Sequence, residues 1–346
     1  MHAKEQNIHF YDFFSTFTIM YDFRTVLQTV ICLFFLCFFA QSTDAQIQPN
    51  SSHYMFNPQL NNPAFYGNND GLNFGANYRH QWAKLDGQPR TVNIFADMTI
   101  PAAHGGIGFN IANDQLGAYN NTWLNVGYAF IQPVKDKFKI AIGINAGINI
   151  SKLDGSKLVT PQGTTGDLND DDLSNQKQNS FKPNLTLGIA FLHKFVQIGI
   201  NYTNLINAKD KFKGDVNTLR PKYGGVFQAY ITSKVNVGKD FKIKPSIQFS
   251  TDFKEFQTDF SVLAGYKEYA YIGLNVRGYN KKSFESLSPV INIIPVKNLN
   301  IIYSYDVNLN KLAKVNKGTH EVTLNYTLPS SKLYKSPKII NNPRFL

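Results

Sequence analysis

The sequence predicts an all-β protein, a transmembrane antiparallel β-barrel of about 14 strands. From Phe138 to Ile150, apolar residues alternate with small and polar ones, chiefly Ala, Gly and Asn. Because successive side chains of a strand point to opposite faces, one face suits lipid and the other a wet, crowded lumen. The same alternation returns along most of the chain, and an export signal precedes it. These observations together favour a barrel that crosses a membrane.

The composition fits this class although its average is mildly polar. The chain has 346 residues, of which 43% are hydrophobic, and its mean hydropathy is -0.25. Barrel strands place apolar residues at every second position, so their average hydropathy stays low even when one face meets lipid. Aromatic residues make up 14% of the chain, with 28 Phe and 18 Tyr. This content suits the aromatic girdles that barrels carry at both membrane interfaces.

Residues 1–45 are predicted to be a secretory signal peptide. Residues 26–40 form the continuous apolar run; Arg24 precedes it, and Thr43, Asp44 and Ala45 follow it. A charged region, an apolar core and a small-residue cleavage site are the layout of such a signal. The run is about five residues shorter than the roughly 20 that a spanning helix needs. Met20 lies where a signal of this kind begins, so it is an alternative start.

Signal cleavage would also change the cysteine content and the charge. Cys32 and Cys37 both lie in the apolar run, so a mature chain that begins at residue 46 has no cysteine and no disulfide. Loss of two basic and four acidic residues raises the net charge from +11 to +13. The lysines are scattered through turns, such as Lys135 and Lys281, rather than clustered with aromatic residues. This pattern favours a solvated or headgroup-facing rim over nucleic-acid binding.

Three regions are expected after the signal. Residues 46–70, rich in Asn and Pro, form an N-terminal periplasmic or luminal segment; residues 71–328 form the outer-membrane barrel; and residues 329–346 form a tail. An even strand number is the rule in bacterial barrels. The predicted strands are 72–82, 89–100, 105–114, 121–132, 138–150, 184–193, 195–203, 223–234, 241–252, 256–267, 269–279, 285–295, 298–308 and 319–328.

The alternation is clearest in the middle and at the end of this series. In 121–132, Leu124, Val126, Tyr128 and Phe130 oppose Asn and small residues, and segments 184–193 and 319–328 repeat the pattern. A soluble β-sandwich alternates too. However, these strands are about twice as long as the usual five or six residues, and their non-apolar face is rich in small residues. Both features favour the membrane barrel.

Two stretches interrupt the alternation. Residues 151–182 and 204–221 are polar and long, and we expect them on one rim, opposite short turns such as 134–137. In the first stretch, Asp167, Asn169 and Asp171 have the spacing of an EF-hand loop. The sixth position is Asp172 rather than Gly, and the twelfth is Gln178 rather than Glu. A solvated acidic loop is therefore favoured, with weak divalent-ion binding as the alternative, and no cofactor or metal site is predicted.

No catalytic site is predicted. His320 and Glu321 are adjacent, but neighbouring strand residues point apart, so they do not face one substrate. The glycines of segment 105–108 are interpreted as strand residues that line a crowded lumen rather than as a phosphate loop. The remaining polar residues of the first two strands, Arg79, Gln81, Trp82, Arg90 and Asp97, are expected to point inward or to lie at a rim.

Particular residues go beyond the generic pattern of a barrel. The chain carries Tyr-Met-Phe-Asn-Pro at 54–58, Asn-Pro-Ala at 62–64, Arg-His-Gln-Trp at 79–82, Tyr-Ser-Tyr-Asp at 303–306, Gly-Thr-His-Glu at 318–321 and Pro-Arg-Phe at 343–345. In their order and spacing, these motifs resemble the PorP/SprF family of type IX secretion outer-membrane proteins. Phe130 and Thr319 depart from the residues common in that family, Tyr and Ser.

The resemblance implies a barrel similar to the fatty-acid-transporter type, in the outer membrane of a Bacteroidetes-type bacterium. The implied partners are the type IX secretion machinery, outer-membrane lipid and a surface protein with a C-terminal sorting domain, such as a gliding adhesin. The implied role is non-enzymatic. Candidates for a lumen plug or for partner binding are Asn57, Pro58, Asn62, Pro63, Ala64, Arg79, Gln81 and Trp82. An outer-membrane channel or transporter for small or hydrophobic substrates remains the alternative.

Overall fold

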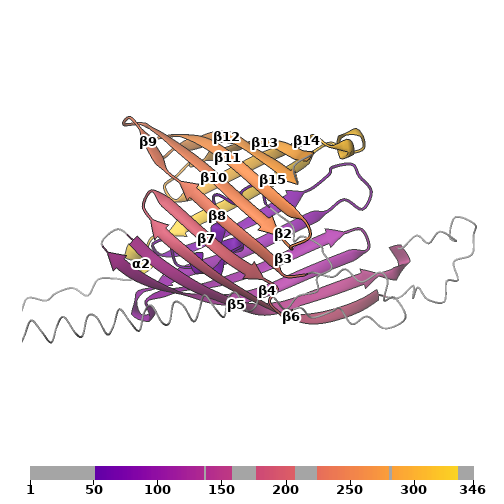
Figure 1. The fold of residues 1–346 in the computed structure, drawn as a ribbon, viewed down its shortest axis with the longest axis horizontal. Coiled ribbons are helices and arrows are strands. Elements are labelled where there is room, and N and C mark those ends of the chain that lie inside the picture. Colours follow the sequence, from indigo (N-terminus) through magenta and orange to yellow (C-terminus); the bar gives the residue numbers. More distant parts are fainter. Residues whose placement is uncertain (1–50, 136–137, 158–176, 207–223, 280–282, 334–346) are drawn as a thin grey trace, which may run out of the picture. The chain divides into compact units, whose positions relative to one another are not determined.

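The alternating segments pair in chain order and close into a cylinder (Figure 1). The computed structural model describes residues 51–135, 138–157, 177–206, 224–279 and 283–333, which belong to one unit, Asp44–Leu346. Each strand pairs antiparallel with its neighbours, the first strand pairs with the last, and β10 pairs with β11 to complete the ring. The described strands therefore leave no sheet edge open, which is the condition for a sheet to cross a bilayer.

The strands have bounds close to those predicted. They are β1 Leu72–His80, β2 Arg90–Ile100, β3 Gly105–Leu116, β4 Tyr119–Lys135, β5 Phe138–Asp154, β6 Lys177–His193, β7 Val196–Thr203, β8 Val226–Ser233, β9 Val235–Val237, β10 Phe241–Thr251, β11 Phe256–Tyr266, β12 Ala270–Tyr279, β13 Ser283–Ile293, β14 Leu299–Asn308 and β15 Thr319–Leu328. Strands β8 and β9 pair with successive parts of β10 and act as one interrupted strand. The closed antiparallel barrel therefore has 14 strands, which confirms the predicted fold class.

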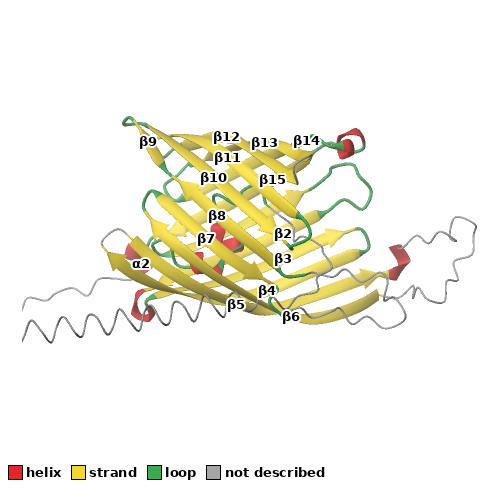
Figure 2. Ribbon diagram, viewed as in Figure 1, coloured by secondary structure: helices red, strands yellow, loops and turns green. Residues whose placement is uncertain are grey.

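Helical structure is sparse (Figure 2). The short helices are η1 Pro58–Leu60, η2 Pro63–Phe65, η3 Pro101–Ala103, η4 Gly155–Lys157, η7 Lys311–Lys314 and α2 Ser330–Leu333. Among the described residues, no helix combines the length and the hydropathy needed to cross a bilayer.

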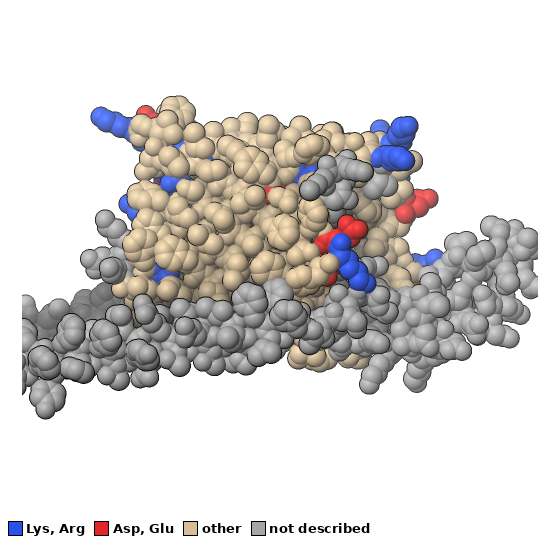
Figure 3. Space-filling view, viewed as in Figure 1, with Lys and Arg blue, Asp and Glu red and all other residues tan. Residues whose placement is uncertain are grey.

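The barrel is apolar outside and polar inside. On β5, Ile142, Ile144 and Ile148 are 43–48% exposed, whereas Ala141 and Gly143 on the opposite face are buried. Most buried polar positions of the strands carry Asn, Ser, Thr or an ion pair. On the visible face, the surface is mostly uncharged, and the charged side chains gather toward its two ends (Figure 3). This arrangement confirms a lipid-facing exterior around a polar lumen.

The two rims differ in the length of their connections. The chain enters β1 and leaves β15 at one end, here called the inner rim, which carries the short turns 101–104, 194–195, 238–240 and 267–269. The opposite end, the outer rim, carries the connections that follow β1, β5, β7 and β14, all nine residues or longer. Barrels of bacterial outer membranes place long loops outside the cell and short turns in the periplasm. The outer rim therefore faces the cell exterior.

Aromatic rings lie near both rims. Near the inner rim, Phe138 stacks on His193 with centroids 4.7 Å apart, and Phe241 packs against Tyr266 at 5.4 Å. Near the outer rim, the Tyr305 and His320 rings lie 4.9 Å apart. Amphipathic rings at both ends of an apolar belt match the two interfaces of a bilayer.

Several predicted boundaries were wrong by a few residues. Strand β1 ends at His80 rather than Trp82, because Trp82 adopts a left-handed backbone with φ 53°. The predicted polar loop 151–182 is shorter than expected, because β5 continues to Asp154 and pairs there with Lys177 of β6. A hairpin beyond the bilayer is held by main-chain pairing and needs no apolar face. The signal peptide, residues 167–172 and the tail from residue 334 lie outside the described residues.

Candidate functional site: a segment inside the barrel

Residues 51–67, here called the luminal segment, lie inside the barrel. Their side chains and main chain contact inward-facing groups around the whole circumference, from Asp97 on β2 through Gly143 on β5 and Ile200 on β7 to Asp306 on β14. A segment that touches so many strands of a closed ring occupies its lumen. Its N-terminal end lies in the outer half of the barrel, and its C-terminal end reaches the inner rim, where β1 begins.

Two Asn-Pro steps give the luminal segment its local shape. Pro58 and Pro63 each open a single turn of 3-10 helix, η1 and η2. Proline suits the first helical position because it has no N–H to leave unpaired and its φ is already helical. The Asn62 side chain caps η2 by accepting a hydrogen bond of 2.9 Å from the Ala64 N–H. These turns shorten the segment so that it lies across the lumen.

Glycines on the barrel wall make room for η2 and the residues that follow it. A Cβ on Gly143 would lie 2.2 Å from the Ala64 nitrogen, and a Cβ on Gly108 would lie 2.3 Å from the Tyr66 ring. Gly127, Gly188 and Gly199 face Tyr66, Asn62 and Phe65 in the same way, and Gly106 meets Gly67 directly. We call these six glycines, on β3 to β7, the glycine cradle. It explains the small residues on the lumen-facing side of these strands.

The Asn62 amide fixes the segment to the wall of the cradle. Its Nδ2 donates hydrogen bonds to the main-chain carbonyls of Ile189 and Ile200, at 3.3 and 3.1 Å. These two residues are partners in the β6–β7 ladder. A side chain that bridges two carbonyls of the wall holds the segment at a defined height.

Aromatic rings of the luminal segment pack against the barrel wall in a small apolar cluster. Tyr54 and Phe65 both pack edge-to-face against Tyr230 of β8, at 6.1 and 5.7 Å. The Tyr54 hydroxyl donates to the Ser246 carbonyl at 3.1 Å, so its polar end is satisfied. Burial raises the pKa of Tyr54, and of Tyr66, above the ordinary tyrosine value, so both remain protonated at physiological pH.

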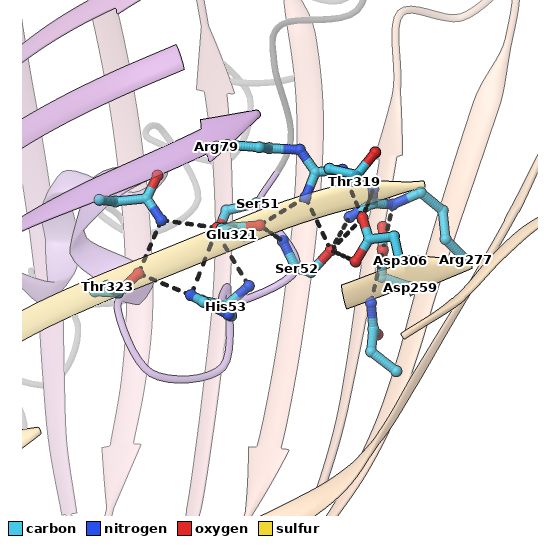
Figure 4. A network of polar contacts seen from close by, with 12 residues as sticks. Ser51, Ser52, His53, Arg79, Asp259, Arg277, Asp306, Thr319, Glu321 and Thr323 are labelled. Atoms are coloured by element: carbon cyan, nitrogen blue, oxygen red, sulfur yellow. Dashed lines mark hydrogen bonds and ion pairs between the residues drawn. The ribbon is translucent and has the colours of Figure 1, made fainter. Parts of the chain in front are cut away.

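The N-terminal end of the luminal segment docks onto a buried ion network (Figure 4). Arg79 of β1 contacts Asp306 of β14 at 2.7 Å and Glu321 of β15 at 2.6 Å. Arg277 of β12 contacts Asp259 of β11 at 2.7 Å. All five side chains are at most 4% exposed. Buried charges are tolerated because they are paired and hydrogen-bonded, and the loss of one partner is costly.

Ser52 connects the segment to this network. Its main-chain N–H donates to Glu321 Oε2 at 2.8 Å, and its hydroxyl donates to Asp306 at 3.0 Å. The same hydroxyl oxygen accepts from Arg79 at 3.1 Å and from Arg277 at 3.2 Å. Ser51 also donates its hydroxyl to Glu321. The serine pair therefore adds hydrogen bonds to both arginines and to two carboxylates of the network.

His53 lies next to the network as a neutral group. Its Nδ1 is 2.7 Å from the Thr323 hydroxyl and 3.6 Å from Glu321. Burial lowers the pKa of His53 below its ordinary value, and the nearby Glu321 and Asp306 only partly oppose this effect.

The structure places the candidate residues in three locations. Asn57, Pro58, Asn62, Pro63 and Ala64 lie in the luminal segment, where Asn57 accepts a 2.9 Å hydrogen bond from Asn325. Arg79 lies in the ion network, whereas Gln81 and Trp82 lie at the outer rim, where the Trp82 N–H donates to the Thr319 hydroxyl at 3.2 Å.

The other polar residues named from the sequence are also inward or at a rim. Arg90 is exposed at the outer end of β2, and Asp97 points inward, where it accepts from the Gly67 N–H at 3.0 Å. Glu321 points into the lumen, while His320 points outward and contacts the Tyr303 hydroxyl at 2.9 Å. Adjacent residues on a strand thus lie on opposite faces, as expected.

Sequence reasoning did not find the ion network as a unit. Asp259 and Arg277 were not singled out, Asp306 appeared only within a motif, and Glu321 was considered only within a motif and as the neighbour of His320. The available signal was their place in the alternation of each strand. Each of these charged residues lies at a lumen-facing position, where other positions carry Asn, Ser or Gly. Within the described ranges, no three His, Cys, Asp or Glu side chains are placed to hold a metal ion.

Several solved structures have folds similar to that of this chain. Among solved structures, the chain is similar to the Ralstonia pickettii toluene transporter TbuX, with 14% identity, a TM-score of 0.47 and coverage of 80% of this chain and 93% of that chain. The P. putida toluene transporter TodX has 9% identity and a TM-score of 0.46, and the match covers 79% of this chain and 94% of that chain. The CymD monoaromatic hydrocarbon channel has 10% identity and a TM-score of 0.45, and the match covers 81% of this chain and 93% of that chain. TM-scores below 0.5 say nothing of a shared substrate. The comparison with curated proteins gives no match.

The match to a protein family is more informative. The family model described as type IX secretion system membrane protein PorP/SprF matches residues 43–326, which include the luminal segment and nearly all of the barrel. The chain therefore belongs to the PorP/SprF family and is an outer-membrane β-barrel component of a type IX secretion system.

Proposed function

We propose that this protein helps to secrete, or to anchor at the cell surface, specific proteins that carry a C-terminal sorting domain, such as gliding adhesins, and that it does so without catalysis. Membership of a type IX secretion family supports the link to the secretion machinery. The observation that carries the proposal is the luminal segment, which crosses the lumen and contacts the barrel wall from β2 to β14 rather than leaving a wide pore.

A closed lumen favours an accessory over a channel. A diffusive channel needs a continuous water-filled path lined by groups that substrates can reach. Here η2 lies against the glycine cradle, and Ser52 holds the other end to two arginines and two carboxylates. A solute could pass only after the buried ion network is broken, and the loss of buried ion pairs costs several kcal/mol of free energy. Passive diffusion through the barrel is therefore disfavoured. The barrel then acts as a membrane platform, and its outer rim is the surface offered to a client.

The candidate residues in these three locations take different roles in this proposal. Asn57, Pro58, Asn62, Pro63 and Ala64 form the plug, and Arg79 fastens it. Gln81 and Trp82, at the outer rim, are placed for contact with a client or with the machinery. His320 and Glu321 face opposite sides, so they do not act as a catalytic pair.

The test is deletion of the gene, followed by protease shaving of intact cells and identification of the released surface proteins. The proposal expects selective loss of one or a few sorting-domain proteins, while other surface proteins remain. Complementation with the full chain restores them, and a Gln81→Ala, Trp82→Ala double variant restores them less well. An unchanged surface, together with a stable open pore of the purified protein, would instead favour the alternative of an outer-membrane channel or transporter for small or hydrophobic substrates.

A further inference from the structure

The luminal segment leaves part of the lumen unfilled on its outer-rim side. This cavity has a volume of about 100 Å³ and opens to solvent. Ser51, His53, Asn57 and Asn61 of the luminal segment form its floor. Its wall comes from β2 to β7 and carries five asparagines, together with Trp123. We call it the amide vestibule, and its wall asparagines are Asn93, Asn110, Asn125, Asn145 and Asn184.

Among the described residues, the lining of the vestibule includes no Asp, Glu, Lys or Arg. The buried ion pairs lie behind its floor, where Ser51 and His53 contact Glu321. Those charges are already paired with one another. A charged ligand that entered the vestibule would lose its hydration without gaining a counter-charge. The occupant that fits is therefore uncharged.

The wall amides offer more hydrogen bonds than the protein uses. In the described part of the chain, Asn110 Nδ2, Asn145 Oδ1 and Asn184 Oδ1 have no hydrogen-bond partner. Asn110 and Asn184 are only 7% and 8% exposed. The Asn184 Nδ2 donates to Asn125 Oδ1 at 3.3 Å, whereas its own Oδ1 has no partner among the described residues. Buried polar groups without partners are rare and call for a partner such as a ligand or water.

We propose that the amide vestibule binds the terminal ring of a neutral saccharide that enters from the outer rim, while the remaining rings extend toward solvent. A saccharide hydroxyl both donates and accepts, and an asparagine amide offers one acceptor and two donors. One amide can therefore bind two neighbouring hydroxyls at once. Several asparagines on adjacent strands, with Thr91, Thr186 and Thr203 beside them, present such groups in a continuous wall.

A polypeptide is a poorer match for the same wall. Extended peptides gain affinity mainly by pairing their main chain with an exposed sheet edge. The strands of this barrel close on themselves, and the vestibule is lined by side chains rather than by an open strand edge. A peptide would also bring side chains that need apolar or charged subsites, and the wall is largely neutral and polar.

The experiment is titration calorimetry of the full chain, purified in detergent, with maltotriose, cellotriose and chitotriose as neutral probes. An acidic oligogalacturonate and an uncharged Gly-Ser peptide serve as comparison ligands. The proposal expects at least one neutral trisaccharide to bind, and each lost amide, in Asn110→Leu and Asn145→Leu, to weaken binding roughly 3- to 10-fold, as for one or two hydrogen bonds.

The matched control is Asn113→Leu, because Asn113 lies on the same strand as Asn110 but is bonded to Asn120 and Thr122 outside the vestibule. The heat-induced gel shift of each variant shows whether it is folded, and Asn125→Gln provides a conservative second test. Absence of binding by all three trisaccharides, equal binding by the wall variants, or preference for the peptide would each overturn the proposal. Saccharide binding is measured without any secretion assay, so its outcome is separate from that of the proposed function.

Discussion

Arg79 and Glu321 stand directly opposite each other on β1 and β15, the first and last strands of the barrel, and their side chains meet at 2.6 Å inside the lumen. The same Glu321 oxygen accepts the main-chain N–H of Ser52. One ion pair therefore joins the seam where the barrel closes to the segment that lies inside it. Closure of the barrel and docking of the luminal segment are coupled through these residues.

The first prediction concerns Arg79→Met. The substitution keeps the apolar stem but leaves Asp306 and Glu321 without their main partner, so it should cost about 3–5 kcal/mol, as for other broken buried pairs. Thermal unfolding, followed by the gel shift of the folded barrel, measures the loss. Arg90→Met, at an exposed position of the outer rim, is the matched control and should leave the transition unchanged. Equal stability of the two variants would show that the network does not hold the barrel together.

The second prediction concerns the glycine cradle. A Val at Gly143 meets the Ala64 nitrogen, so it should force the luminal segment away from the wall at a cost of about 1–3 kcal/mol, which is roughly 5- to 150-fold in the docking equilibrium. An Ala64→Cys reporter detects this, because the chain's two cysteines, Cys32 and Cys37, lie in the predicted signal peptide.

Thiol labelling of this reporter should therefore be much faster in Gly143→Val. The control is Ile142→Val, whose side chain is on the lipid-facing side of the same strand. If both variants label at the rate of the parent protein, the cradle does not determine the position of the segment.

The third prediction concerns pH. Burial lowers the pKa of His53 from its ordinary value of 6.5, so the docked segment binds fewer protons than a detached one. Docking is therefore strongest above pH 6.5 and weakens as the pH falls from 6.5 toward the lowered pKa. Labelling of the Ala64→Cys reporter should accelerate over that range, and His53→Gln should flatten the profile. A profile that is the same with and without His53 would assign the dependence to another group.

The fourth prediction is that His320→Ala leaves the display of client proteins unchanged. His320 lies on the outer face and contacts Tyr303 and Tyr305 rather than Glu321. Surface proteomics of cells that carry the variant measures this, and Trp82→Ala at the outer rim is the contrasting change. Loss of display with His320→Ala would point to a role for this side chain that its geometry does not provide.

The strands could be predicted from the sequence because their signal is local. The alternation from Phe138 onward depends only on which face of a strand meets lipid, and that choice repeats at every second residue. Ends of strands were less predictable. Strand β1 stops before Trp82 because this residue has a left-handed backbone. The pairing of β5 with β6 continues to Asp154 and Lys177 through the main chain, and the polar side chains there give no alternating pattern that predicts it.

The docking of the luminal segment could not be predicted, because its contacts join residues far apart in the chain. Ser52 contacts Asp306, Arg277 and Arg79, which come from three different strands. The two Asn-Pro steps indicated turns, and the glycines indicated a crowded lumen. Neither observation predicts which residues of the segment contact which residues of the wall. Only the closed barrel brings Asn62 to the β6–β7 ladder and Tyr66 to Gly108.

The most direct test of the central claim, that the luminal segment closes the barrel, is single-channel conductance of the purified protein in planar bilayers. The full chain should show little conductance, and deletion of residues 57–67 should open a stable pore, since this removes η1, η2 and the contacts with the glycine cradle. A stable open pore in the full chain, or equal conductance with and without these residues, would contradict the claim.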